Sequence, residues 1–442
     1  MAIELETRAE PRRRAKWDQS VTSAPHKQAR YGAFSLLRGG LNRQSHWTPI
    51  LNEPDAPGRH YDVVIIGGGG HGLATAHYLA ANHGITRVCV IERGWIGGGN
   101  TGRNTTVIRS NYFFPQSAAL YDLSLGLYEG LSKAFDYNIM FSQRGMWMLA
   151  HDRHGMEMLH RSANAMLLNG VDAELHDGAG VRARIPGLNP DPRFPILGGL
   201  LQPRGGTARH DAVAWAYARA ASRAGVHILQ KTAVTGLRQQ GGRITAVDTS
   251  RGTIGCDRVV VAAAGHSSEV AAMAGLSLPI QSFALQAFVS EPVKPCLDTV
   301  LLSPATGVYL SQSDKGELVI GAGLDLFVSY AQRGSLPVME QAAAGVIELF
   351  PQFSRLRFLR QWAGICDVVH DSSPILDESA IAGLHFNCGW GTGGFKAIPA
   401  GGWLTAHHVA TGSAHPIAQP FGFGRFTSGA MIDEAAASGI AH

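Results

Sequence analysis

The stretch YDVVIIGGGGHGLATAHYLAANHGITRVCVIERG, residues 61–94, decides the fold of this chain. It contains an apolar strand at 63–66, a glycine-rich turn, an alanine-rich helix at 73–82 and a second apolar strand at 88–91. This order of strand, tight turn, helix and strand, within about thirty residues, is typical of a βαβ unit in a parallel sheet. The stretch therefore predicts a Rossmann-like domain.

The turn in this unit has the spacing GxGxxG, formed by Gly67, Gly69 and Gly72. The first glycine permits the tight turn, the second lets the backbone approach a pyrophosphate, and the third allows the helix to pack closely on the strand. The helix N-terminus would then face the phosphates with its unbonded N–H groups. Glu92 ends the second strand, where a carboxylate can accept hydrogen bonds from both ribose hydroxyls. We expect a dinucleotide here, with a purely structural glycine turn as the alternative.

The composition is that of a chain with a large core, because 45% of its 442 residues are hydrophobic and 16% are charged. The sequence has no apolar run of about 20 residues and no apolar secretory signal, so we expect a cytoplasmic protein that does not enter a membrane. Residues 1–43 hold nine Lys or Arg against four Asp or Glu, a surplus of five charges. No nucleic-acid module follows this segment, so we expect a solvated tail or an over-extended start of translation rather than nucleic-acid binding.

The cysteines show no metal-like spacing and predict neither a disulfide framework nor a metal site. They are Cys89, Cys256, Cys296, Cys366 and Cys388.

Further along the chain, helix-and-strand segments alternate with segments of period-two strands such as GELVIGAG. The alternation predicts an α/β fold (α+β overall), in which a Rossmann-like FAD-binding domain is interleaved with an antiparallel-sheet substrate domain. The expected boundaries are 1–59 for a basic, partner-contacting arm, 60–140, 199–272 and 363–415 for the FAD-binding domain, 141–198 and 273–362 for the substrate domain, and 416–442 for a C-terminal tail.

Two later glycine segments favour FAD over an exchanging nicotinamide cofactor. RVVVAAAGHSS supplies Gly265, where the backbone is expected to pass close to the cofactor. GWGTGGFK places Gly391, Gly393 and Gly394 before a helix, whose N-terminus can face the flavin ring. Such scattered contacts suit a long cofactor that stays bound.

Several long blocks of the sequence resemble those of a known protein family. They are GGGGHGLATAHYLA, GNTGRNTTVIRSNY, FSQRGM, TARHDAVAWAYARA, LVIGAG, FNCGWGTGGFK and FTSGAMIDE. From about residue 30 to the C-terminus the chain resembles the D-amino-acid-oxidase-like flavoprotein superfamily, and within it the β subunits of heterotetrameric sarcosine oxidases. The resemblance implies a noncovalent FAD that oxidises sarcosine and a covalent FMN that passes electrons to O2. It also implies α, γ and δ partner subunits, with tetrahydrofolate as co-substrate on the α subunit.

The resemblance also assigns residues. His210 matches the histidine that carries FMN, with Arg209 in its vicinity; a histidine that only caps its helix and an exposed arginine are the alternatives. Arg109 and Lys396 match the cations that hold the substrate carboxylate, whereas a core ion pair and a solvated helix-end charge are the alternatives. The expected FAD contacts are extended to Gly70, His71, Asn100, Thr101, Thr105 and Val234.

Two residues found in monomeric relatives are absent at the matching positions of this sequence. Monomeric relatives have an oxygen-activating lysine near flavin N5, and Val319 stands at that place here. They also tether FAD through a cysteine seven residues before the acid of a DxxP motif; here that acid is Asp371 and the position holds Gly364, with Cys366 nearby. We therefore expect a noncovalent FAD that reacts slowly with oxygen.

Two other functions remain open at this point. One is a heteromeric FAD/FMN dehydrogenase that acts on proline or an opine and passes electrons to a carrier. The other is a flavin-binding assembly subunit without catalysis, against which the presence of Arg109, Lys396 and His210 argues.

Overall fold

A computed structural model describes residues 32–41, 50–54 and 56–434 of the chain. It divides into two units, at Pro49. In the first unit the described part is helix α1 (Ala33–Leu41), whose apolar Phe34 and Leu41 are exposed. Most of the expected basic arm and the last residues of the expected tail, 435–442, lie outside the described residues.

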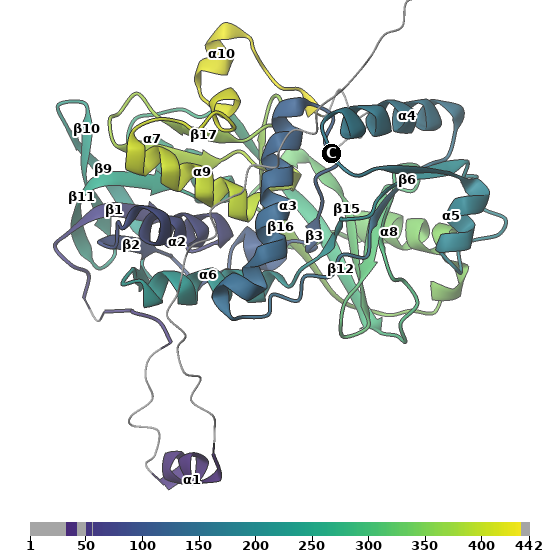
Figure 1. Cartoon of the computed structure of the whole chain (residues 1–442), viewed down its shortest axis with the longest axis horizontal. Helices are drawn as coiled ribbons and strands as arrows, with labels where there is room; N and C mark the ends of the chain where they lie inside the picture. The colour runs from purple at the N-terminus through teal and green to yellow at the C-terminus, as the bar shows by residue number, and fades with distance from the viewer. Residues whose placement is uncertain (1–31, 42–49, 55, 435–442) are drawn as a thin grey trace, which may run out of the picture. The chain divides into compact units, whose positions relative to one another are not determined.

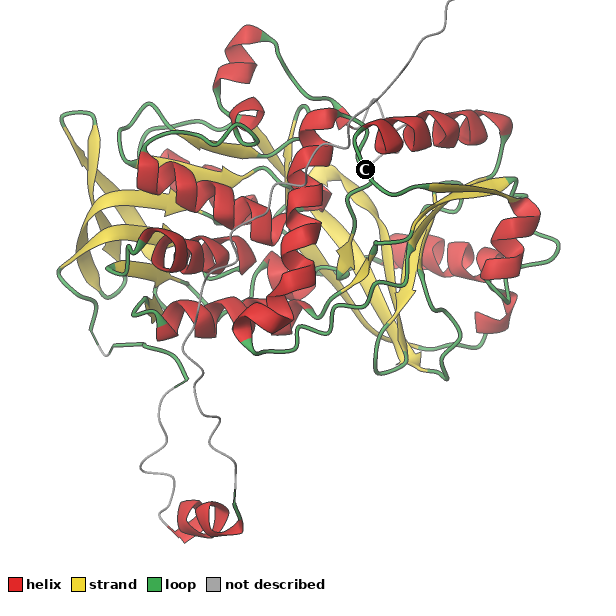
Figure 2. Ribbon diagram, viewed as in Figure 1, coloured by secondary structure: helices red, strands yellow, loops and turns green. Residues whose placement is uncertain are grey.

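The second unit contains two large sheets (Figures 1 and 2). The strands of the first sheet are, in spatial order, β17 (Ile375–Glu378), β18 (Leu384–Cys388), β11 (Gly252–Val261), β1 (His60–Ile66), β2 (Val88–Ile91) and β8 (His227–Leu229), with β10 (Arg243–Thr249) and β9 (Val234–Gln240) joined to β11 as a hairpin. From β18 to β8 the pairing is parallel. Val63 and Ile65 enter one apolar core while Val64 and Ile66 enter another, because both faces of this sheet are covered.

Four helices pack on one face of this sheet around a common core. They are α2 (Gly70–His83), α3 (Pro115–Phe135), α6 (His210–Arg223) and α9 (Ile398–Thr411). A Cβ on Gly402 of α9 would lie 2.4 Å from the Cβ of Ala74 on α2, so glycine permits the close approach of these two helices. Figure 1 shows α2 and α9 side by side in front of the sheet.

The second sheet is mostly antiparallel. Its order is β16 (Phe358–Val369), β12 (Ile280–Pro292), β15 (Glu317–Val328), β14 (Val308–Gln312), β13 (Val300–Ser303), β4 (Met146–Ala150), β6 (Gly198–Gln202) and β5 (Glu174–Asp177). The alternating pattern of MFSQRGMWMLAHD, residues 140–152, predicts a half-buried strand for β4, but all five residues of this strand are buried. The reason is that Trp147 and Leu149 pack into one core on one face of the sheet, while Met146 and Met148 pack into another core on the opposite face.

The other elements of the described part are short or peripheral. They are α4 (Arg153–Leu168), α5 (Gly178–Arg184), α7 (Ser267–Ala272), α8 (Leu336–Leu349), α10 (Gly424–Ser428), the 3-10 turns η1 (Asn100–Arg103), η2 (Ala264–His266), η3 (Pro351–Phe353), η4 (Gly391–Gly393), η5 (Phe395–Ala397) and η6 (Gln419–Phe421), and the strand pair β3 (Val107–Ile108) and β7 (Gly206–Thr207). No helix among the described residues has both the length and the apolar character needed to cross a bilayer.

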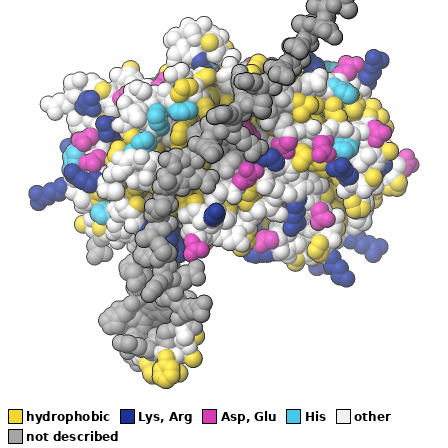
Figure 3. All heavy atoms as spheres, viewed as in Figure 1, with side chains coloured by type: hydrophobic (Ala, Val, Ile, Leu, Met, Phe, Trp, Pro, Cys, Tyr) yellow, Lys and Arg dark blue, Asp and Glu magenta, His cyan; other side chains and the backbone are white. Residues whose placement is uncertain are grey.

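The two sheets draw on alternating segments of the chain, as the interleaved scheme expects. The boundary expected between residues 198 and 199 falls inside β6, which pairs with β4 in the second sheet. The boundary expected at residue 363 falls inside β16, which pairs with β12 as far as Val369. If the domains follow the sheets, that boundary moves beyond residue 369; the division into two domains stays a prediction. On the face seen in Figure 3, basic and acidic side chains of the described residues are interspersed.

Candidate active site

A cavity of about 730 Å³ lies at the carboxyl end of β1, between the two sheets. Both sheets contribute to its wall, with Ile66 and Ile91 from the first and Ala287 and Gly364 from the second. Fourteen of the seventeen residues expected to bind cofactor or substrate line this cavity: Gly67, Gly69, Gly70, His71, Glu92, Asn100, Thr101, Thr105, Arg109, Val234, Gly265, Gly391, Gly394 and Lys396. The remaining three, Gly72, Arg209 and His210, do not.

The GxGxxG turn is as tight as its spacing predicts. Gly67 has φ +117°, and a Cβ there would lie 2.3 Å from the carbonyl oxygen of Ala262. A Cβ on Gly72 would lie 2.0 Å from the Gly67 carbonyl oxygen, so Gly72 serves the packing of α2 on β1 rather than the cavity wall. The turn leaves the start of α2 facing the cavity, as a pyrophosphate site requires.

Glu92 is held in place by two backbone amides. Its Oε2 accepts from Gly68 N–H at 2.8 Å and its Oε1 from Gly94 N–H at 2.8 Å. A carboxylate has about four acceptor positions, so both oxygens can still accept bonds from ribose hydroxyls. The residue is therefore fixed at the cavity wall by bonds that leave it able to bind a ligand.

Some expected contacts also have structural roles. The Asn100 side chain bonds to both backbone groups of Ile365, accepting from its N–H at 2.9 Å and donating to its carbonyl oxygen, which fastens η1 to β16. A Cβ on Gly265 would lie 2.3 Å from the Ile365 side chain, so this glycine is explained by packing against β16 as well as by proximity to a cofactor. The Thr101 hydroxyl accepts from Gly70 N–H at 2.9 Å.

The segment GWGTGGFK does not lead directly into a helix. The turns η4 and η5 come first, and α9 begins only at Ile398, so the expected position of the helix start is corrected. Gly391 has φ +50°, and a Cβ there would have no heavy atom within 4 Å. This glycine therefore borders open space in the cavity wall.

Arg109 and Lys396 come together on a pair of stacked tyrosines. The rings of Tyr112 and Tyr121 are 3.8 Å apart and 8° from parallel. The Arg109 guanidinium carbon lies 4.8 Å from the centre of the Tyr112 ring, and Lys396 Nζ lies 6.0 Å from that of Tyr121. Neither tyrosine could be predicted from the sequence, because a stack between a loop and a helix leaves no local sequence pattern.

The Lys396 amine is buried, with one hydrogen bond from Nζ to the carbonyl oxygen of Thr392 at 3.0 Å. Burial lowers its pKa well below the ordinary value, and the Arg109 cation lowers that pKa further. A bound carboxylate would supply a counter-charge and raise the pKa again. The pair is therefore suited to an anionic ligand.

The cavity wall also contains Tyr309 and Asp367, two titratable residues that were not predicted from the sequence. Tyr309 of β14 accepts a hydrogen bond from the Thr105 hydroxyl at 3.1 Å, and burial raises its pKa to about 12. Asp367 of β16 accepts from Gly389 N–H at 2.6 Å, and burial raises its pKa to about 6. Tyr309 could have been found as a tyrosine in a strand beside LVIGAG, whereas nothing in the sequence marks Asp367.

Val319 was expected at the place of the oxygen-activating lysine beside the flavin, and the structure corrects this position. Val319 does not line the cavity, and β15 contributes Ala322 and Gly323 to the wall instead. None of these three positions carries an amine. Gly364 and Cys366 both line the cavity, and burial raises the pKa of the Cys366 thiol to about 12. A protonated thiol is a poor nucleophile.

His210 lies apart from the cavity, at the first residue of α6. Its Nδ1 accepts from Asp211 N–H at 2.6 Å, so the capping alternative has a physical basis. Burial lowers the pKa of this imidazole, which favours the neutral ring. The Arg209 guanidinium bonds to Asp211 at 2.9 Å and to Asp314 at 3.4 Å, which leaves little of its charge unpaired.

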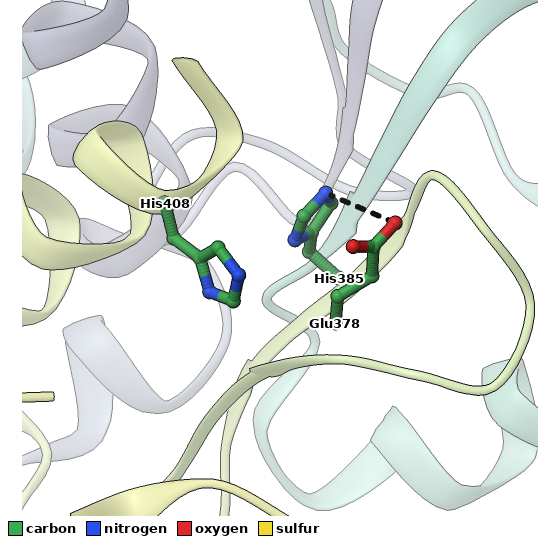
Figure 4. A group of neighbouring side chains, drawn as sticks. All are labelled: Glu378, His385 and His408. Carbon is green, nitrogen blue, oxygen red and sulfur yellow. Dashed lines mark ion pairs between the residues drawn. The ribbon is translucent and has the colours of Figure 1, made fainter. Parts of the chain in front are cut away.

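Glu378, His385 and His408 form a separate cluster whose side chains point toward one another, from β17, β18 and α9 (Figure 4). Each can offer one metal ligand, with these atoms within 4.8 Å of one another. His385 Nε2 is 4.0 Å from Glu378 Oε1, whereas ligands about 2.0 Å from a tetrahedral zinc lie only about 3.3 Å apart. The cluster is better described as a cross-strand pair with an edge-to-face His385–His408 contact, centroids 5.2 Å apart.

Comparisons with known proteins place the chain among FAD-dependent oxidoreductases. The chain matches the family model described as DAO, FAD dependent oxidoreductase, over residues 62–408. It is 52% identical to "Sarcosine oxidase subunit beta" of Rhodobacter capsulatus, over 93% of this chain and 100% of that protein. It is 53% identical to the protein of the same name from Rhizobium meliloti, over 92% of this chain and 97% of that protein. A solved L-proline dehydrogenase from P. horikoshii has a TM-score of 0.80 at 25% identity, covering 84% of this chain and 99% of its own.

Proposed function

Because the chain belongs to the DAO family of FAD-dependent oxidoreductases, and within it to the family of sarcosine oxidase β subunits, we propose that it oxidises the N-methyl group of sarcosine. The overall reaction is sarcosine + H2O + O2 giving glycine, formaldehyde and H2O2. In the presence of tetrahydrofolate, bound by an α subunit, 5,10-methylenetetrahydrofolate replaces formaldehyde. The observation that carries the proposal is the Arg109 and Lys396 pair on the wall of the nucleotide cavity.

The cavity fits FAD on three grounds. Its volume of about 730 Å³ suits a large cofactor, the GxGxxG turn opens onto it, and the amide-anchored Glu92 carboxylate stands where a ribose is expected. When bound, the flavin accepts the hydride of the methyl group. The raised pKa of Cys366 supports a noncovalent cofactor. The chain's own contribution is to bind, orient and shield the reactants.

Arg109 and Lys396 would hold the sarcosine carboxylate so that its methyl group faces the flavin. An arginine can bind a carboxylate through two parallel hydrogen bonds, which fixes orientation as well as affinity. Lys396 adds a second attraction once the carboxylate has raised its pKa. The Tyr309 phenol, protonated at neutral pH because its pKa is about 12, can donate a hydrogen bond toward the same space.

We further propose that His210 carries the FMN, from which electrons reach O2. The neutral imidazole has the nucleophilic nitrogen that a bond to a flavin requires, and its place outside the cavity lining suits a second cofactor, separate from the FAD. On this proposal the chain assembles with α, γ and δ subunits. Arg209 would lie in the vicinity of the FMN. Its guanidinium would then interact with the FMN in addition to its two present partners, Asp211 and Asp314.

An aerobic assay of the assembled enzyme with sarcosine tests the reaction. We expect glycine, formaldehyde and H2O2 in equal amounts, with no added electron carrier. Sarcosine turnover that requires an artificial acceptor and gives no peroxide would contradict an oxidase.

The second candidate is a dehydrogenase that acts on proline. The likeness to the solved L-proline dehydrogenase, at a TM-score of 0.80, favours it. The dehydrogenase would reduce a dye with proline as donor and produce no peroxide, which distinguishes it from the oxidase in the same assay.

A further inference from the structure

The C-terminal segment FTSGAMIDE, residues 426–434, reaches back to the substrate side of the cavity. Its last residue, Glu434, is buried, and its carboxylate accepts hydrogen bonds from Phe113 N–H at 3.1 Å and from Phe114 N–H at 2.9 Å. These two residues directly precede α3 and follow the loop that begins at Arg109. A residue 320 positions away along the chain is thus bonded to the loop that carries the expected substrate arginine.

Glu434 also supplies what the N-terminus of α3 lacks. The N-cap residue, Phe114, has no side chain that can cap the helix, and Pro115 follows it. The first N–H groups of a helix need acceptors, and a carboxylate is favoured there by the positive end of the helix dipole. The Ser117 hydroxyl in the first turn bonds to the same carboxylate. Glu434 therefore caps α3 from a distant part of the chain.

The segment that brings Glu434 into place is itself anchored. Arg425 donates to both oxygens of Asp371, at 2.7 and 3.2 Å, with both side chains almost fully buried. Ile432 N–H donates to the same carboxylate at 3.3 Å, and the Ser373 hydroxyl donates to the Ile432 carbonyl oxygen at 2.9 Å. We call residues 425–434 the C-terminal clasp. It joins the turn that follows β16 to the start of α3.

Helix α3 connects the two expected substrate cations. Its N-terminal side continues the Arg109 loop, and it carries Tyr121, which stacks on Tyr112 beneath Arg109. Further along the helix, Ser124 donates to the Lys396 carbonyl oxygen at 2.6 Å. A shift of α3 at its start would therefore move the arginine relative to the lysine.

We propose that Glu434 is a positioning residue, through which the C-terminal clasp fixes the Arg109 loop in the geometry that binds the substrate carboxylate. The proposal rests on the proposed function for the identity of the substrate, but the clasp itself does not. Glu434 does not line the cavity. It acts on the Arg109 loop through its hydrogen bonds to Phe113 and Phe114 and through the attraction between its carboxylate and the Arg109 cation.

The test is Glu434→Gln in the assembled, FAD-containing enzyme, because glutamine keeps the shape but can accept only one of the two amide bonds. We expect the amides of Phe113 and Phe114 to exchange hydrogen at least about tenfold faster, since each loses a charge-assisted bond. We expect KM for sarcosine to rise about 3- to 30-fold with kcat within about twofold, as uniform binding is lost. Glu340→Gln, the same change at an exposed position of α8, is the control and should alter neither quantity.

Hydrogen exchange at Phe113 and Phe114 and a KM that both stay at wild-type values would overturn the proposal. If the Tm falls while exchange and KM stay unchanged, Glu434 contributes to packing alone. Should Glu434→Gln not fold, Ser117→Ala removes one partner of the same carboxylate and should give smaller changes in the same direction. If sarcosine does not reduce the wild-type flavin, the proposed function fails, while the exchange of Phe113 and Phe114 still decides whether the clasp exists.

Discussion

Arg109→Met removes the guanidinium from the cavity wall while keeping a side chain of similar length. In the structure this group donates to Asn111 Oδ1 at 2.6 Å and lies over the ring of Tyr112. Both contacts are local, so the loop retains its connection through Phe113 and Phe114 to the C-terminal clasp. The chief loss is expected in the binding of the substrate carboxylate.

Three contributions determine how much substrate affinity Arg109→Met should lose. A charge-assisted contact to the carboxylate contributes about 1.5 to 3 kcal/mol, which corresponds to a loss of about 10- to 150-fold. The contact with Tyr112 contributes about 0.5 to 1 kcal/mol, but it is present without substrate and so affects stability rather than affinity. Removing Arg109 also relieves the repulsion that lowers the pKa of Lys396, so that more of this lysine is protonated and part of the loss is offset. We therefore expect a decrease in the lower part of this range, about 10- to 50-fold.

Anaerobic stopped-flow mixing measures the effect directly, as the rate of FAD reduction against sarcosine concentration. Half-saturation should move upward by most of the expected factor. Arg153→Met is the matched control, because that side chain is 92% exposed and pairs with Glu157 within α4. Reduction of the Arg109→Met enzyme at the wild-type rate and half-saturation would refute the assignment of Arg109 as the carboxylate anchor.

Three other outcomes are expected. The affinity for methoxyacetate, a carboxylate without an amine, should fall as pH rises through the depressed pKa of Lys396, because only the protonated amine attracts the anion; equilibrium titration should find this fall absent in Lys396→Met. His210→Ala should leave FAD reduction by sarcosine fast but slow reoxidation by O2, and acid precipitation should then leave no flavin on the protein; wild-type reoxidation in stopped flow would contradict the FMN assignment. Desolvation lowers the pKa of the half-buried His77 to about 4, so the folded protein takes up this proton at a lower pH than the unfolded chain does, and stability is lost as pH falls below about 6.5. His77→Phe should reduce that loss by about 2 kcal/mol between neutral pH and about pH 4.5, measured by urea unfolding, and an unchanged acid branch would show that His77 is not its source.

The βαβ unit could be predicted from sequence because its signals are local. The second strand was expected at 88–91 and is observed as Val88–Ile91. The helix was expected at 73–82 but begins at Gly70, because the sequence pattern counted the glycines as turn. A Cβ on Gly70 would lie 2.2 Å from the Ile398 side chain of α9, and such a tertiary constraint outweighs the low helix propensity of glycine.

The substrate side of the cavity could be predicted only in part. Arg109 and Lys396 were named through motifs, but their meeting on Tyr112 and Tyr121 depends on how α3 packs. The bonds of Glu434 to the start of α3 join residues 320 positions apart, which no periodicity reveals. The full burial of β4 likewise depends on the elements that cover each face of its sheet.

Sarcosine oxidation is tested most directly by an anaerobic titration of the assembled enzyme with sarcosine, proline and dimethylglycine, followed by the absorbance of the oxidised flavin. We expect sarcosine to bleach the flavin fully, and at lower concentration than proline or dimethylglycine. Flavin that stays oxidised at saturating sarcosine, or that proline reduces more readily, would contradict this expectation.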